Sequence, residues 1–242
     1  MFFPLLFKVL AWGGSELDSA FEELLPRLLV PSSFIPLFHA ILDLPALVLA
    51  LEDFERGSGY RPGMAPAGTV KSPAPEALLA LMDVAYTGSI SADDGSGAGN
   101  VTAAGSLEAR SAFFTELLRD ENEGLVEQHW SHPGMAIGLK AAASHSKSGR
   151  LKHACDVAPS LLMIYFQTAI QHVSQALLCA LLPMIFARIV TLFPDESFRS
   201  KVHHLCIDTV LTVFGRMPEL ICVLRKPIIN AIGQPYTSAA KD

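Results

Sequence analysis

The chain has 242 residues, of which 50% are apolar and only 17% are charged, and its net charge is −6 at neutral pH. This length suffices for one large domain or two small ones with a buried core. The acidic balance argues against a nucleic-acid-binding surface, which is typically strongly basic.

The two most apolar stretches are too short or too interrupted to cross a membrane. The run 176–187 stops at Arg188, before the roughly 18 residues that a membrane-spanning helix needs. The N-terminal run Met1–Trp12 contains Lys8 and lacks both a basic leader and a small-residue cleavage site. We therefore expect neither a signal peptide nor a transmembrane helix.

Residues 1–55 are expected to form a first solenoid segment of short helices punctuated by proline. Ser19 opens a capping-box pattern, Ser33 is expected to begin a helix with Pro36 in its first turn, and Asp43 is expected to cap the next helix. Apolar residues with the spacing of a helix face support two of these helices. They are Phe21, Leu24, Leu25, Leu28 and Leu29 in one, and Leu47, Val48, Leu51 and Phe54 in the other.

Residues 56–150 are interpreted as a linker-rich insertion with isolated helices. The stretches 56–75 and 88–106 are rich in Gly, Ser, Pro and Ala, a composition typical of loops and flexible linkers. Helices are expected at 76–86, 107–119 and about 135–143.

Residues 151–233 carry the strongest helical pattern, and 234–242 form a tail. Asp195 is a predicted N-cap, Pro218 a predicted helix start, and Gly215 and Gly233 predicted residues just past helix ends. The helices are expected at about 157–173, 175–193, 196–214 and 218–232.

These four helices have apolar faces too broad for one helix pair to bury. The faces include Leu161, Tyr165 and Phe166 in the first helix, and Phe198 and Val202 in the third. Corresponding helices recur after about 40 residues, the period of HEAT and armadillo repeats. Stacking of such pairs would bury the faces. We therefore predict an all-α fold, an α-solenoid of HEAT/armadillo-like antiparallel helix pairs.

Few residues suggest a catalytic, metal-binding or nucleotide-binding site. His203 and Cys206 share a helix face and could begin a zinc site, but no second His/Cys pair has metal spacing. His129 and His132 have no better support, and the glycine run 95–100 lacks the pattern of a dinucleotide-binding loop. We expect no catalytic, cofactor-binding or metal-binding residues, and therefore no enzyme.

The four cysteines and one group of basic residues have ordinary structural interpretations. The cysteines lie in apolar helical patterns without a C-x-x-C pair, so we expect buried free thiols and a reducing cytoplasm. They are Cys155, Cys179, Cys206 and Cys222. A basic group could contact anionic lipid or phosphate, although a solvated surface is the simpler interpretation. It comprises Lys140, Lys147, Arg150 and Lys152.

Several strings, in their order, resemble the zeta subunit of the fifth adaptor protein complex. They are FFPLLFKVLAW (Phe2–Trp12), ELLPRLL (Glu23–Leu29), FHAILDLPAL (Phe38–Leu47) and the block Ala154–Gly233. Residues 56–150 match this family poorly. The resemblance implies that the chain is a part, from the later section, of a longer α-solenoid without catalytic residues.

The resemblance also implies a function. Such a subunit would be a scaffold of a cytoplasmic coat-like complex, peripheral on late endosomes and lysosomes, that sorts proteins together with its other subunits and with spatacsin- and spastizin-like proteins. A role in DNA double-strand-break repair, also attached to this family, remains the alternative. A helical bundle that binds a small molecule is a third hypothesis, which a deep pocket with converging polar groups would favour.

Overall fold

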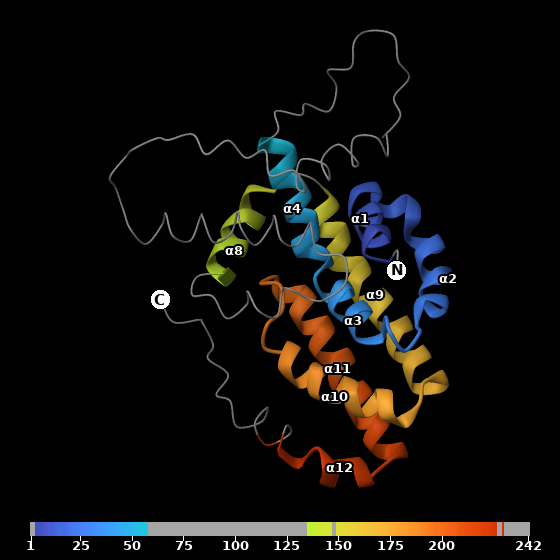
Figure 1. The fold of residues 1–242 in the computed structure, drawn as a ribbon. Coiled ribbons are helices and arrows are strands. Elements are labelled where there is room, and N and C mark those ends of the chain that lie inside the picture. The colour runs from blue at the N-terminus through green and yellow to red at the C-terminus, as the bar shows by residue number, and fades with distance from the viewer. Residues whose placement is uncertain (1–2, 58–134, 147–148, 227–228, 230–242) are drawn as a thin grey trace.

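The fold is seen in a computed structural model that describes residues 3–57, 135–146, 149–226 and 229 (Figure 1). Within these residues every regular element is a helix and no β-strand occurs, which confirms the predicted all-α class. The helices expected at 76–86 and 107–119, the stretch 88–106 and the tail lie outside the described residues.

In the described residues, four α-helices and a short 3-10 helix come from the N-terminal block, and five α-helices follow. They are α1 (Phe3–Gly13), η1 (Gly14–Leu17), α2 (Asp18–Leu28), α3 (Phe34–Leu42), α4 (Leu44–Gly57), α8 (Met135–His145), α9 (Gly149–His172), α10 (Gln175–Arg188), α11 (Glu196–Arg216) and α12 (Glu219–Val223).

The start of α2 differs from the prediction. Gly14 has a φ of 65°, a conformation that glycine adopts at little cost, and turns the chain from α1 into η1. Because η1 continues directly into α2, Leu17 occupies the N-cap and makes no side-chain cap. Ser19 lies inside the first turn, so the predicted capping box is wrong.

Ser33 precedes α3, as predicted, but does not cap it. Its backbone is helical and its side chain makes no capping hydrogen bond to α3. The hydroxyl instead lies against the carbonyl oxygens of Leu28 and Val30, and it accepts a 3.1 Å hydrogen bond from the amide of Val30. Ser33 therefore stabilises the turn between α2 and α3.

Helix α9 is the centre of the fold (Figure 1). It packs against α2, α3 and α4 with its first half and middle, and against α11 along its length. Tyr165 of α9 is fully buried, donates a 2.8 Å hydrogen bond to the carbonyl of Phe34, and stacks on the Phe34 ring. Residues far apart in sequence thus share one hydrophobic core.

The helices α9, α10 and α11 alternate in direction, as in an α-solenoid. Val173 and Ser174 connect α9 to α10, and residues 189–195 return the chain to α11. Contacts between α9 and α11 join residues 45 positions apart (Asp156 and Lys201) and 46 positions apart (Ile170 and Arg216). This constant offset means that α9 and α11 run parallel, as equivalent helices of successive pairs do.

Four helix boundaries in this block differ from the prediction. Helix α9 begins at Gly149 instead of 157, and α10 ends at Arg188 instead of 193. The apolar side chains of Leu192 and Phe193 are buried in the connecting loop and not in a helix. Gly215 lies inside α11, which continues to Arg216 instead of 214, and α12 ends at Val223 instead of 232. Asp195 is the N-cap of α11 as predicted, and Pro218 directly precedes α12, at the predicted helix start. Gly233 lies outside the described residues.

The cap at Asp195 makes a testable contribution to stability. Its carboxylate accepts a 2.8 Å hydrogen bond from the amide of Phe198, whose side chain is fully buried. We expect Asp195→Ala to lower the free energy of unfolding by about 1 kcal/mol, the usual value of an N-cap. Urea unfolding followed by circular dichroism measures this loss.

The matched control is Ser174→Ala at the N-terminus of α10. The hydroxyl of Ser174 is exposed and lies 3.4 Å from the amide of Leu177, so this cap is weaker. A loss at Ser174 equal to or larger than the loss at Asp195 would contradict the assignment.

No single described helix is long and apolar enough to cross a membrane. Helix α3 and the first part of α4 reach that length and composition only together, and they meet at an angle of 61°.

Candidate interaction surface

The possible zinc pair does not assemble. The Nε2 atom of His203 donates a 2.8 Å hydrogen bond to the carbonyl of Ile189, while Cys206 is buried. Across the described ranges, no three His, Cys, Asp or Glu residues gather closely enough to hold a metal ion. His129, His132 and the glycine run 95–100 lie outside the described residues.

The four cysteines are all free, but only two fit the prediction of full burial. Cys155 and Cys206 are buried, Cys179 is half-buried and Cys222 is exposed. Burial raises the pKa of Cys155 to about 12, with a further contribution from Asp195, and burial alone raises the pKa of Cys206 to about 12.

These differences predict the order of thiol alkylation, because the thiolate is the reactive form. In native protein at pH 8, iodoacetamide should label Cys222 first and leave Cys155 and Cys206 unlabelled. In 6 M guanidinium all four should react at similar rates, since the folded environment is lost (a concentration of about 6 M unfolds most domains). Peptide mass spectrometry reads the order, and rapid native labelling of Cys206 would contradict the packing of α11.

The basic residues do not converge on one point. Lys140 belongs to α8 and is exposed, and Lys152 is exposed on α9. The guanidinium of Arg150 lies 5.4 Å from the ring centre of Trp12, a cation–π contact that joins α9 to α1. Lys147 lies outside the described residues.

A charged pair is buried between α10 and the turn that joins α3 to α4. The Nη2 atom of Arg188 donates a 2.5 Å hydrogen bond to Oδ1 of Asp43, and the two side chains are 1% and 7% exposed. The Nε and Nη1 atoms of Arg188 have no hydrogen-bond partner in the described part of the chain. His39 lies near this pair, and burial, followed by the charge of Arg188, lowers its pKa from 6.5 to about 4.

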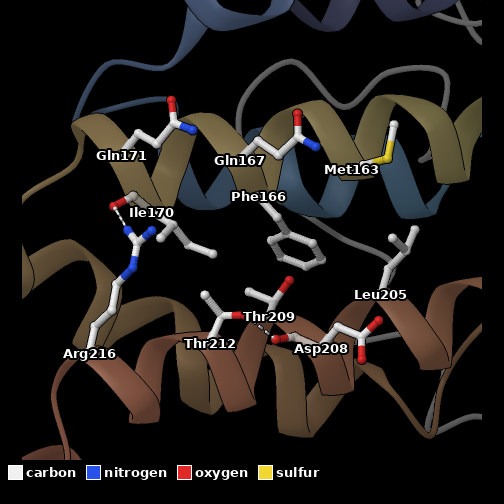
Figure 2. Close-up of a pocket in the computed structure, with 10 residues that line it drawn as sticks. All are labelled: Met163, Phe166, Gln167, Ile170, Gln171, Leu205, Asp208, Thr209, Thr212 and Arg216. Carbon is white, nitrogen blue, oxygen red and sulfur yellow. Dashed lines mark hydrogen bonds between the residues drawn. The ribbon is translucent and has the colours of Figure 1, made fainter.

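An open groove of about 290 Å³ runs between the parallel helices α9 and α11 (Figure 2). Its floor is formed in part by the apolar side chains of Phe166, which is buried, and Ile170, which is half-buried, while Met163 lies on the α9 rim and is 44% exposed. The groove is lined by Met163, Phe166, Gln167, Ile170 and Gln171 of α9, and by Leu205, Asp208, Thr209, Thr212 and Arg216 of α11.

Polar groups follow both rims of this groove. Gln167 and Gln171 lie one helical turn apart on α9, and both are exposed. On α11, Asp208 is at one end and Arg216 at the other, where the Nη1 atom of Arg216 donates a 3.2 Å hydrogen bond to the carbonyl of Ile170. The two charged residues form no ion pair with a described residue.

The sequence did not identify the groove or the buried pair. Gln167 and Gln171 were visible as polar positions beside the apolar face of α9, but only the lateral register with α11 shows that they border a groove. Arg188 ended an apolar run in the sequence, and nothing local indicated that it would be buried against Asp43, 145 positions away.

Comparison with known proteins gives one consistent result. The family described as "AP-5 complex subunit zeta-1, C-terminal TPR repeats" matches residues 83–242. The AP-5 complex subunit zeta-1 of Mus musculus is 26% identical over 231 residues, and that of Homo sapiens is 25% identical over 231 residues. No solved structure matches significantly.

The matches cover nearly all of this chain but only part of each relative. Each match includes 96% of this chain but 25% of the relative, so the chain spans about a quarter of the length of the curated relatives. Because the family match covers well over half of the residues, the chain belongs to the family of AP-5 complex subunit zeta-1, in its C-terminal repeat region.

Proposed function

We propose that this chain is a non-enzymatic scaffold segment of an adaptor complex that acts in endosomal and lysosomal protein transport. The observation that carries the proposal is the family match over residues 83–242, together with relatives whose name is that of an adaptor-complex subunit. The stack of α9, α10 and α11 supports it, because stacked helix pairs offer long surfaces to partner proteins.

The proposal includes partners and location. The partners are the other subunits of the adaptor complex and spatacsin- and spastizin-like proteins, and the location is the cytoplasm, peripheral on late endosomes and lysosomes through those partners. The DNA-repair alternative has less support, because the chain has a net charge of −6 and its basic residues on α8 and α9 are scattered.

Co-expression with the other adaptor-complex subunits tests the proposal. The tagged chain should co-elute with at least one subunit in size-exclusion chromatography, and the complex should survive nuclease treatment. Elution of every subunit apart from the chain, combined with salt-dependent binding of the chain to duplex DNA, would favour the repair role instead.

A further inference from the structure

The groove between α9 and α11 combines features that suit an extended peptide. Its floor includes the apolar side chains of Phe166 and Ile170, and Met163 adds an apolar side chain that is 44% exposed on the α9 rim, at the end near Asp208. The amides of Gln167 and Gln171 each offer donors and an acceptor, which match the alternating C=O and N–H groups of an extended backbone.

The charges at the two ends indicate which peptide side chains would fit. Asp208 and Arg216 are eight positions apart on α11, which corresponds to about 12 Å along a helix. An extended peptide advances about 3.3 Å per residue, so residues four positions apart span about the same length. The residue midway between them projects to the same side and would meet the apolar floor.

We propose that this groove binds an extended peptide segment of a partner protein with the pattern basic–x–apolar–x–acidic. The groove accepts this peptide in a single orientation, so the pattern runs either from the N-terminus or from the C-terminus of the peptide, but not both. The basic side chain pairs with Asp208, the acidic one with Arg216, and the central apolar side chain contacts Phe166 and Ile170. The hydrogen bond from Arg216 to the carbonyl of Ile170 holds the guanidinium at the end of the groove, and its remaining N–H groups are available to a carboxylate.

This inference goes beyond the proposed function, because it assigns a ligand class to one surface of the chain. It is measured on the isolated 242-residue chain, so its failure would leave membership in an adaptor complex untouched. Conversely, peptide binding would persist if the chain served a different assembly.

Two fluorescein-labelled peptides test the proposal by fluorescence anisotropy. Their sequences are Gly-Arg-Ser-Leu-Ser-Glu-Gly and the charge-exchanged Gly-Glu-Ser-Leu-Ser-Arg-Gly, both with blocked ends. We expect saturable binding of one peptide with a Kd below about 1 mM, and weaker binding of the other. Equal affinity for both, or no binding of either, would overturn the proposal.

The charge-exchanged variant Asp208→Arg/Arg216→Asp should reverse the preference between the two peptides. Arg216→Glu alone should weaken the preferred peptide by about fivefold, the effect of an exposed ion pair. The matched control is Arg199→Glu, an exposed arginine of α11 outside the groove, which should leave both affinities unchanged. An unchanged preference in the charge-exchanged variant, or an equal loss of affinity in the control, would show that the charges of the groove do not determine which peptide binds.

Discussion

Replacement of Asp43 by alanine is expected to lower the free energy of unfolding by about 3–5 kcal/mol, because it leaves the charge of Arg188 buried without its partner. Arg188 is 1% exposed, and its Nε and Nη1 atoms already lack hydrogen-bond partners among the described residues, so its charge stays buried when Asp43 is removed. Urea unfolding at pH 7, followed by circular dichroism, measures the loss.

Two further variants separate charge from packing. The double variant Asp43→Ala/Arg188→Met removes both charges while retaining most of the volume, so it should recover much of the lost stability. Asp156 and Lys201 form an ion pair in which both side chains are about half exposed. Asp156→Ala removes this pair and should lower the free energy of unfolding by about 0–1 kcal/mol. Similar losses at Asp43 and Asp156 would contradict the burial of the Arg188 pair.

Acidification is expected to destabilise the fold through His39. The pKa of this histidine falls from 6.5 to about 4 because of burial and the nearby charge of Arg188. Between these values the unfolded state binds more protons than the folded state, so stability is complete above pH 6.5 and declines as pH falls towards 4. The contribution is roughly 3 kcal/mol over the whole interval.

The variant His39→Leu removes this titration and also removes a buried Nδ1 atom that has no hydrogen-bond partner within the described residues. It should therefore lose less stability than the parent between pH 7 and pH 4.5 (the lower value lies inside the titration interval). The control is His172→Leu, at an exposed position of α9, which should retain the parent's acid sensitivity. Identical pH profiles for His39→Leu and the parent would show that His39 is not buried as a neutral group.

The helices and their buried faces could be predicted because periodicity is a local property. Leu161, Tyr165 and Phe166 in α9, and Phe198 and Val202 in α11, are buried as their spacing indicated. Helix boundaries were harder where distant contacts decide them. The first turns of α9 contain polar residues and resemble a linker, yet His153 pairs with Asp18 at 2.9 Å and so joins this end of α9 to α2.

The interaction surface depends on how helices lie beside one another, and sequence does not fix that register. The repeat period of about 40 residues suggested that α9 and α11 are equivalent helices. Only their observed offset places Gln167 and Gln171 opposite Asp208 and Arg216. The buried pair of Arg188 and Asp43 has the same origin, because it depends on packing between α10 and the turn after α3.

Quantitative affinity purification of the chain from cells tests most directly the claim that it works by holding other proteins. The tagged parent should enrich the other subunits of the adaptor complex, together with spatacsin- and spastizin-like proteins, and the destabilised Asp43→Ala variant should lose them. Nuclease treatment should not change this set. Enrichment of DNA-repair proteins that disappears with nuclease, without any adaptor subunit, would contradict the account.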